Sequence, residues 1–269
     1  MLTSAIGLSP DPKIVQLMIE HYAVQANLWL SENNVQQLRE LYIKASTYPR
    51  TSTKKSMAAD GFYLDGPYQS FQNIYLGFDH TVPVLLKIVT NEEEIARIQL
   101  LYATFQNRVI HPSIASFKIY GTPSTNRLMI QMTTYPATLQ SLYLSTMEMN
   151  SLFLDQMIDA LQYLHELNFA HMDIKPTNIA IDYSGRFILI DLGSTCEIDN
   201  MTESTPMFVP TGIKDFHGLY KSSANTDFWM LATTLYSKHH EIFNRVSKND
   251  ILTFFANESY FDPLRNLLM

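Results

Sequence analysis

Four polar side chains of complementary chemistry lie within residues 173–191, namely Asp173, Lys175, Asn178 and Asp191. A carboxylate can orient a hydroxyl group and accept its proton, which suits Asp173. A cation two residues later, Lys175, can steady a negatively charged group during its transfer. Amide and carboxylate oxygens are hard ligands of the kind that Mg²⁺ prefers, which suits Asn178 and Asp191. This set of side chains suits phosphoryl transfer, a reaction that depends mostly on positioning and charge stabilisation.

A short predicted hairpin positions these side chains. The apolar runs at residues 179–182 and 187–190 predict two strands, and the sequence Tyr-Ser-Gly-Arg between them predicts a turn. Asn178 comes directly before the first strand, and Asp191 directly follows the second. We therefore expect the two candidate magnesium ligands at the two ends of one hairpin.

Residues 171–178 read His-Met-Asp-Ile-Lys-Pro-Thr-Asn, and residues 191–193 read Asp-Leu-Gly. In this order and spacing they resemble the catalytic loop H-R-D-x-K-x-x-N and the D-F-G motif of protein kinases. The resemblance implies an α+β, bilobal fold. It places a small, β-rich N-lobe at about residues 61–132 and a larger, mainly helical but shortened C-lobe at about residues 136–269.

The same resemblance assigns roles to the four side chains. It implies that Asp173 is the catalytic base, that Lys175 is a catalytic cation, and that Asn178 and Asp191 hold Mg²⁺ against the phosphates of ATP. Pro176 follows Lys175 as it does in serine/threonine kinases, whereas the tyrosine-specific type usually differs there. We therefore expect a divergent serine/threonine kinase that transfers the ATP γ-phosphate to a protein hydroxyl.

Lys87 is the candidate phosphate-binding lysine, because residues 84–87 resemble the V-A-I-K strand of the kinase small lobe. The resemblance implies that Lys87 binds the α- and β-phosphates and pairs with an acid on the next helix. The acids that follow are Glu92, Glu93 and Glu94. We favour Glu94 because it shares the apolar helix face with Ile98, and Glu93 is the second choice. Alternatively, all three acids simply favour the first turn of a helix.

The stretch that corresponds to the kinase glycine-rich loop departs from the family pattern. The pattern G-x-G-x-x-G-x-V lets backbone amides approach the phosphates closely, but residues 66–74 keep a single glycine, Gly66. We expect nucleotide to be held less tightly there, or to be held through Ser70 and Gln72.

The adenine pocket is expected farther along the chain. Residues 127–132 predict a strand that leads to a hinge at Thr133, Thr134 and Tyr135. The resemblance places Met132 at the back of the pocket. We therefore expect nucleotide contacts from Met132, Thr133 and Tyr135.

The predicted large lobe begins with an amphipathic helix over residues 150–167. Residues 204–210 resemble the end of the kinase activation segment, with Thr211 in place of its final Glu. Asp227 resembles the acid at the start of the central helix, and we expect it to bond the backbone of the catalytic loop. Met172 replaces an Arg that commonly gathers a phosphorylated activation segment, which implies activity without that phosphorylation.

Residues 1–55 lie outside the resemblance. Apolar residues recur at helical spacing after Pro10 and again after Ser31, which predicts two helices. Residues 48–60 are polar and predict a linker to a kinase-like domain at residues 61–269. This helical N-terminal extension either binds a regulatory partner or packs on the main domain.

Composition narrows the remaining classes of function. The 269 residues include 26 acidic and 19 basic ones, for a net charge of −7, which argues against a nucleic-acid partner. Cys196 is the single cysteine, which excludes an internal disulfide and argues against structural zinc. The sequence predicts neither a signal peptide nor a membrane span. We expect a cytoplasmic protein in a reducing compartment, with the nucleus as an alternative.

Two other functions stay open at this point. A nucleotide-binding pseudokinase, acting as a scaffold or allosteric partner, is favoured by the lost glycines, by Thr211 and by the short large lobe. The retained lysine, base and metal ligands oppose it. A phosphotransferase that acts on a small molecule would share the Asp and the Asn, but seldom the Lys175-Pro176 pair.

Overall fold

The computed structural model describes residues 63–67, 73–79, 82–122, 127–135, 137–144, 146–182, 184–210, 217–240, 246–256 and 259–268. Several features predicted from the sequence lie outside these residues. They are the N-terminal extension, Ser70, Gln72 and Thr211. The boundary between the extension and the main domain therefore stays a prediction.

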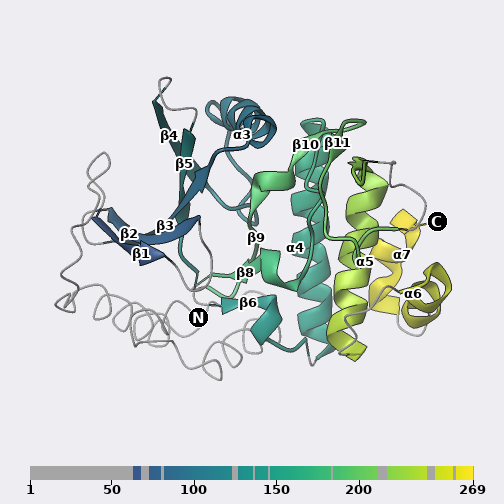
Figure 1. Cartoon of the computed structure of the whole chain (residues 1–269). Helices are drawn as coiled ribbons and strands as arrows, with labels where there is room; N and C mark the ends of the chain where they lie inside the picture. The colour runs from purple at the N-terminus through teal and green to yellow at the C-terminus, as the bar shows by residue number, and fades with distance from the viewer. Residues whose placement is uncertain are drawn as a thin grey trace.

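The first lobe is an antiparallel five-stranded sheet accompanied by one helix (Figure 1). In chain order its elements are β1 (Tyr63–Pro67), β2 (Ile74–Asp79), β3 (Val82–Val89), α3 (Glu92–Phe105), β4 (Phe117–Thr122) and β5 (Arg127–Thr133). The strands lie in the order β1-β2-β3-β5-β4, so β3 is the middle strand. Lys87 pairs with Ile74 on one side and with Ile130 on the other. This lysine therefore lies inside the sheet and not at a solvated edge.

The start and the buried face of α3 follow from its sequence. Asn91 caps the helix, because its side-chain oxygen accepts a hydrogen bond from the backbone amide of Glu94 at 2.9 Å. The buried side chains of α3 recur at helical spacing, and they are Ile98, Leu101 and Phe105. Residues four apart share a helix face, so Glu94 points to the same side as Ile98.

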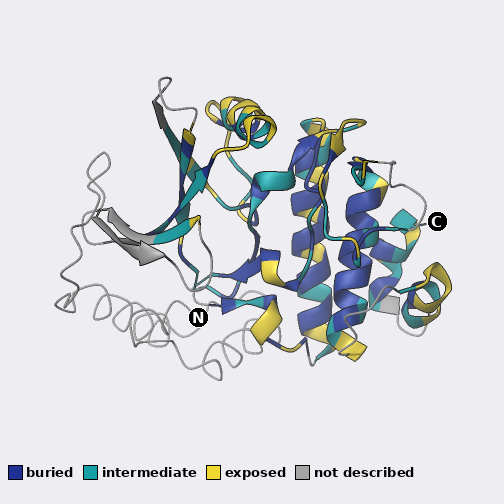
Figure 2. Cartoon of the chain, viewed as in Figure 1, coloured by how far each residue is buried: buried dark blue, intermediate teal, exposed yellow. Residues whose placement is uncertain are grey.

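The second lobe is mainly helical and holds most of the buried apolar side chains (Figure 2). Its helices are α4 (Met147–Glu166), α5 (Ala224–His240), α6 (Lys248–Phe255) and α7 (Asp262–Leu268). Helices α4 and α5 run side by side through its core (Figure 1). Together the two lobes confirm the predicted α+β, bilobal architecture. Among the residues that the structure describes, no helix has both the length and the apolar character needed to cross a membrane.

Short elements on either side of α4 carry the candidate site. Before α4 come β6 (Ala137–Thr138) and η1 (Leu139–Ser141). After it come β7 (Phe169–Ala170), η2 (Pro176–Asn178), β8 (Ile179–Ile181), β9 (Phe187–Leu189), η3 (Leu192–Ser194), β10 (Cys196–Glu197), β11 (Met201–Thr202) and β12 (Tyr220–Lys221), while η4 (Ser259–Phe261) precedes α7. Strands β8 and β9 pair antiparallel, with Ile179 opposite Leu189. This pairing confirms the predicted hairpin.

The helix predicted to begin at residue 150 begins three residues earlier, at Met147. Thr146 is its cap, since the Thr146 side chain accepts a hydrogen bond from the backbone amide of Met149 at 3.1 Å. Asn150 lies inside the first turn, where its side-chain amide donates to the carbonyls of Leu144 and Thr146. Asn is a favoured capping residue, but here its side chain holds the segment before the helix instead.

Candidate active site

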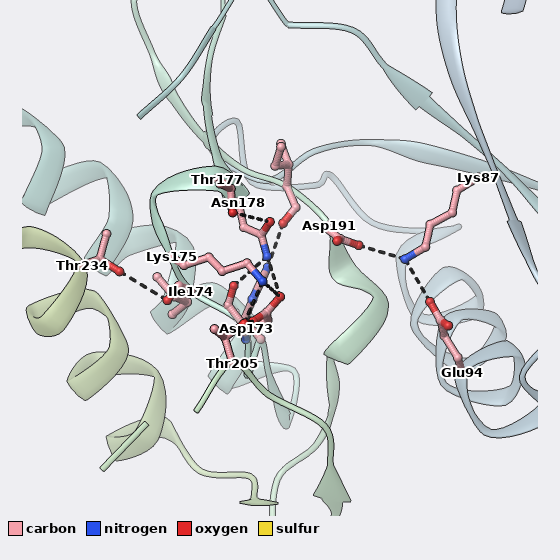
Figure 3. A network of polar contacts seen from close by, with 12 residues as sticks. Lys87, Glu94, Asp173, Ile174, Lys175, Thr177, Asn178, Asp191, Thr205 and Thr234 are labelled. Carbon is pink, nitrogen blue, oxygen red and sulfur yellow. Dashed lines mark hydrogen bonds and ion pairs between the residues drawn. The ribbon is translucent and has the colours of Figure 1, made fainter. Parts of the chain in front are cut away.

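A lysine and two acids from separate elements meet between the lobes (Figure 3). The Lys87 Nζ atom lies 3.0 Å from Glu94 Oε1 and 3.1 Å from Asp191 Oδ1. Lys87 comes from β3, Glu94 from α3, and Asp191 directly precedes η3. Of the three acids considered as partners for Lys87, Glu94 is the one that forms the ion pair.

In this ion-paired group, the neighbouring charges together shift the pKa values of Lys87 and Asp191 more than burial does. Burial alone lowers the pKa of Lys87, but the carboxylates of Asp191 and Glu94 together raise that pKa above its ordinary value. Burial alone raises the pKa of Asp191, yet Lys87, with smaller contributions from His171 and Lys175, holds that pKa below its ordinary value. Both shifts favour the charged forms of Lys87 and Asp191 at neutral pH.

Gly193 packs directly against the ion pair. A Cβ atom at this position would lie 2.8 Å from Glu94 Oε1, 2.9 Å from Lys87 Nζ and 3.3 Å from Asp191 Oδ1. The first two separations are shorter than packed atoms tolerate, so a side chain would push the charged groups apart. The close approach of η3 to the Lys87–Glu94 pair thus favours glycine at this position, because any side chain there would displace the ends of Lys87 and Glu94.

A second polar group surrounds Asp173 (Figure 3). Asp173 Oδ2 accepts hydrogen bonds from Lys175 Nζ at 2.8 Å and from Asn178 Nδ2 at 2.7 Å. Asp173 Oδ1 accepts one from Thr205 Oγ1 at 2.5 Å, and Lys175 Nζ also donates to Thr205 Oγ1 at 2.8 Å. Each contact restricts the rotation of the carboxylate, so Asp173 is held in one orientation.

Helix α5 supports the backbone just before Asp173. The fully buried carboxylate of Asp227 accepts the backbone amides of His171 and Met172, each at 2.8 Å. Its Oδ2 atom also lies 2.9 Å from His165 Nε2. These bonds confirm the predicted contact between Asp227 and the backbone of the catalytic loop.

His171 connects this loop to the segment that carries Asp191. Its Nδ1 atom accepts the backbone amide of Asp173 at 3.2 Å. Its Nε2 atom donates to the carbonyl of Ile190 at 3.1 Å. A buried histidine thus links the candidate base to the residue before the candidate metal ligand.

Asn178 and Asp191 fit a magnesium ion. The backbone amide of Ile190 donates to the Asn178 carbonyl at 2.9 Å, which brings both ligands to the open end of the β8–β9 hairpin. Asn178 Nδ2 is committed to Asp173, which leaves Oδ1 with one long contact of 3.5 Å from Thr177. Within the described residues, no three or more His, Cys, Asp or Glu side chains gather into a metal site. Mg²⁺ usually takes few protein ligands and adds waters and phosphate oxygens, so two oxygen ligands suit it.

The predicted hinge residues follow the strand beside Lys87. Met132 on β5 is paired with Leu85, two residues before Lys87 on β3. Paired residues and alternate residues of a strand share one face of a sheet, so Met132 lies on the Lys87 face. Thr133 ends β5, and Tyr135 follows it with a hydroxyl whose pKa burial raises to about 12.

The structure adds one residue that the sequence did not mark as functional, since Thr205 bonds Asp173 across 32 residues. It also gives Gly193, known so far only as part of the Asp-Leu-Gly motif, a place where an added Cβ would crowd the ion pair. The sequence signal for Thr205 was the resemblance of residues 204–210 to the end of a kinase activation segment. That resemblance locates the segment, but it does not predict that Thr205 bonds Asp173. Cys196 is buried, and burial raises the pKa of its thiol, so it is a poor nucleophile.

Comparisons with known proteins agree with this geometry. A family model described as Protein kinase domain matches residues 79–258. Aurora kinase B from Danio rerio is 23% identical over 231 residues, which cover 76% of this chain and 71% of that protein. Calcium/calmodulin-dependent protein kinase kinase from Caenorhabditis elegans is 32% identical over 84 residues, which cover 29% of this chain but only 16% of that protein.

A solved structure shares the fold. The Cydia pomonella Granulovirus kinase PK-1 superposes with a TM-score of 0.55 over 77% of this chain and 87% of that chain. The two sequences are 15% identical over this region, so the likeness concerns the fold alone.

Proposed function

This chain belongs to the protein kinase family, and on that premise we propose that it is an active serine/threonine protein kinase. It transfers the γ-phosphate of ATP to a hydroxyl group of a protein substrate. The observation that carries the proposal is the fixed carboxylate of Asp173, which receives hydrogen bonds from Lys175, Asn178 and Thr205. Phosphoryl transfer depends mainly on the positioning of the reacting groups, so it requires a base that is held in one orientation.

In the proposed reaction Asp173 and the side chains around it have separate roles. The substrate hydroxyl donates a hydrogen bond to Asp173, which takes the proton as the new oxygen–phosphorus bond forms and the bond from the γ-phosphorus to the bridging oxygen of ADP breaks. Lys175, 2.8 Å from Asp173, neutralises charge on the group in transfer. Thr205 and Asn178 keep the carboxylate aimed while the proton moves.

Nucleotide and metal are held by residues of both lobes. Lys87, kept in place by Glu94, binds phosphate oxygens of ATP. Magnesium, when bound through Asn178 and Asp191, supplies positive charge that neutralises those oxygens. The lowered pKa of Asp191 keeps its carboxylate ionised and ready to bind the metal.

Two features support a serine or threonine hydroxyl as the acceptor. Lys175-Pro176 follows the base as in the serine/threonine type, and Lys175 bonds the hydroxyl of Thr205 next to that base. Curated relatives with serine/threonine kinase in their names, such as RUNKEL from Arabidopsis thaliana at 31% identity over 87 residues, point the same way.

Transfer of labelled γ-phosphate tests the proposal. Wild-type protein with ATP and magnesium is incubated alone and with a generic basic protein, beside Asp173→Ala, Asp191→Ala and Glu148→Ala. Glu148 is an exposed acid on α4, outside both polar groups, and serves as the control. We expect transfer to serine or threonine by the wild type and the control, and none by the other two variants.

Other outcomes would point to the alternative functions. No transfer, together with thermal stabilisation by nucleotide that Asp191→Ala abolishes, would identify a nucleotide-binding pseudokinase. Transfer to small hydroxyl compounds but not to proteins would identify a small-molecule phosphotransferase.

A further inference from the structure

A buried threonine on α5 contacts the catalytic loop on the far side of Asp173 (Figure 3). The Thr234 Oγ1 atom donates a hydrogen bond to the backbone carbonyl of Ile174 at 3.3 Å. Both residues are buried, with 0% of Thr234 and 1% of Ile174 exposed. Among the described residues, no backbone amide donates to this carbonyl. The Thr234 hydroxyl therefore satisfies a carbonyl that water does not reach.

Thr234 and Asp227 both bond the backbone of the catalytic loop, on opposite sides of Asp173 along the chain. Asp227 bonds the amides of His171 and Met172, the two residues before Asp173. Thr234 bonds the carbonyl of the residue after it. Asp227 and Thr234 are two turns apart on one face of α5, and two turns of helix rise about 10 Å, a span that a few residues of loop can follow.

We propose that Thr234 is a positioning residue for the reaction, and that α5 holds Asp173 between two attachments, Asp227 before it and Thr234 after it. The inference rests on the proposed kinase function. The Ile174 carbonyl belongs to the peptide plane that joins Ile174 to Lys175, so fixing it orients the backbone where Lys175 begins and holds Ile174, the residue next to Asp173, in place. The side-chain bond between Asp173 and Lys175, at 2.8 Å, depends on that backbone.

The chain offers a matched control in the neighbouring residue. Thr233 is also buried, with 2% exposed, but its hydroxyl donates to the Trp229 carbonyl within its own helix at 3.0 Å. Thr233→Val and Thr234→Val remove the same group from adjacent buried positions of α5. Only the second removes a bond to the catalytic loop.

Kinetics separate a positioning role from a structural one. We expect Thr234→Val to lower kcat about three- to tenfold, the range for one net hydrogen bond, with KM for ATP changed less than about twofold. Thr234→Ser keeps the hydroxyl and should recover most of the loss. Thr233→Val should behave like the wild type in kcat, and matched melting temperatures for the two valine variants would exclude a general loss of folding.

A second readout does not depend on activity. Amide hydrogen exchange of peptides covering residues 171–176 should be at least about threefold faster in Thr234→Val than in Thr233→Val, because the loop opens more often. Equal exchange and equal kcat in the two valine variants would overturn the proposal. Faster exchange in a protein whose wild type transfers no phosphate would instead uphold the attachment and refute the kinase function.

Discussion

The Lys87–Glu94 ion pair depends on the absence of a side chain at Gly193. Alanine there would place a carbon 2.8 Å from Glu94 Oε1 and 2.9 Å from Lys87 Nζ, in the space that the pair occupies. We expect Gly193→Ala to reduce kcat/KM for ATP by about tenfold or more, the cost of a displaced charge-assisted hydrogen bond at the phosphate site. Steady-state kinetics with varied ATP measure this effect.

The neighbouring Ser194→Ala is the control for Gly193→Ala, because Thr202 bonds the backbone carbonyl of Ser194, which alanine keeps, and the Ser194 hydroxyl bonds none of the residues that the structure describes. A Gly193→Ala variant with wild-type kcat/KM would show that the ion pair tolerates displacement. In that case its geometry would not limit the reaction.

Glu94 and Glu93 form a natural pair of variants on α3. Glu94 bonds Lys87 at 3.0 Å, whereas Glu93 is exposed. We expect Glu94→Gln to raise KM for ATP several-fold, since Lys87 would lose a charged partner, whereas Glu93→Gln should change it by less than twofold. Kinetics at saturating protein substrate measure both, and equal effects would mean that the acids act only through the helix dipole.

Local spacing explains which residue contacts could be predicted. Glu94 was favoured because it lies one turn before Ile98 on an apolar face, and helix geometry alone gives that relation. Thr205 and Thr234 bond the catalytic loop across 32 and 60 residues. No periodicity relates positions so far apart, and hydroxyl side chains are common enough that their type gives no signal.

At the scale of elements, the turn between α3 and β4 contributes a stability that depends on pH. His111 Nδ1 accepts the backbone amide of Ser113 at 3.2 Å, which requires the neutral ring. Burial lowers the pKa of His111, and Arg186 adds to this, while Asp159 opposes it. The folded state therefore binds this proton less readily than the unfolded chain. The stability from the neutral ring is present above the ordinary histidine pKa and is lost as pH falls through the lower folded value.

Asparagine at position 111 can accept the same amide but does not titrate. We expect the melting temperature of the wild type to exceed that of His111→Asn by the largest margin above pH 7. The margin should shrink as the pH is lowered toward 5. Thermal melts of the two proteins at matched pH values test this, and a margin that stays constant or grows on acidification would contradict it.

The segment between η3 and Thr205 is held without phosphate. Strand β11 pairs with β12, and the Thr202 hydroxyl donates to the Ser194 carbonyl at 3.1 Å. Met172, where the family commonly has a phosphate-binding Arg, is fully buried. We expect phosphatase-treated protein, with its dephosphorylation verified by mass spectrometry, to keep its turnover within about twofold, since Met172 carries no charge for a phosphate to neutralise. Activity that disappears with phosphatase and returns after incubation with ATP would contradict this.

Elements were easier to predict than their ends. The β8–β9 hairpin follows from two apolar runs around a turn, and its register places Asn178 and Asp191 together. The start of α4 was predicted three residues too late, because an amphipathic pattern locates a helix but not its cap. The cap is Thr146, whose side chain accepts the backbone amide of Met149.

At the scale of the whole molecule, the site lies between two lobes whose cores meet, because Leu101 and Phe105 of α3 belong to the large cluster of the second lobe. Small clusters around Val89 and Ile130, and around Val84 and Leu86, form the core of the first lobe, whereas the large cluster of the second lobe is built on α4 and α5. The kinase motifs predicted this division, since they lie on both sides of the hinge. The packing of the lobes against each other depends on contacts such as Lys87 with Asp191, which no local pattern specifies.

Nucleotide with magnesium should therefore stabilise the molecule as one unit, because its binding groups come from both lobes. At a concentration one hundred times its Kd, a ligand adds about 2.7 kcal/mol, which corresponds to a rise of about 5–10 °C in the melting temperature of a domain of this size. We expect that rise for ATP with magnesium, and a clearly smaller one when magnesium is removed by a chelator. Asp191→Asn should lose the difference between the two conditions.

Asp182→Asn should retain that difference, because Asp182 lies at the turn end of the same hairpin, where its Oδ1 atom accepts hydrogen bonds from Ser184 and Arg186. A wild-type shift that is equal with and without magnesium would remove Asn178 and Asp191 as metal ligands. A shift that depends on magnesium but persists in Asp191→Asn would place the metal elsewhere. Loss of magnesium dependence in Asp191→Asn, with that dependence kept in Asp182→Asn, would agree with Asp191 holding the metal from the second lobe while Lys87 binds the phosphates from the first.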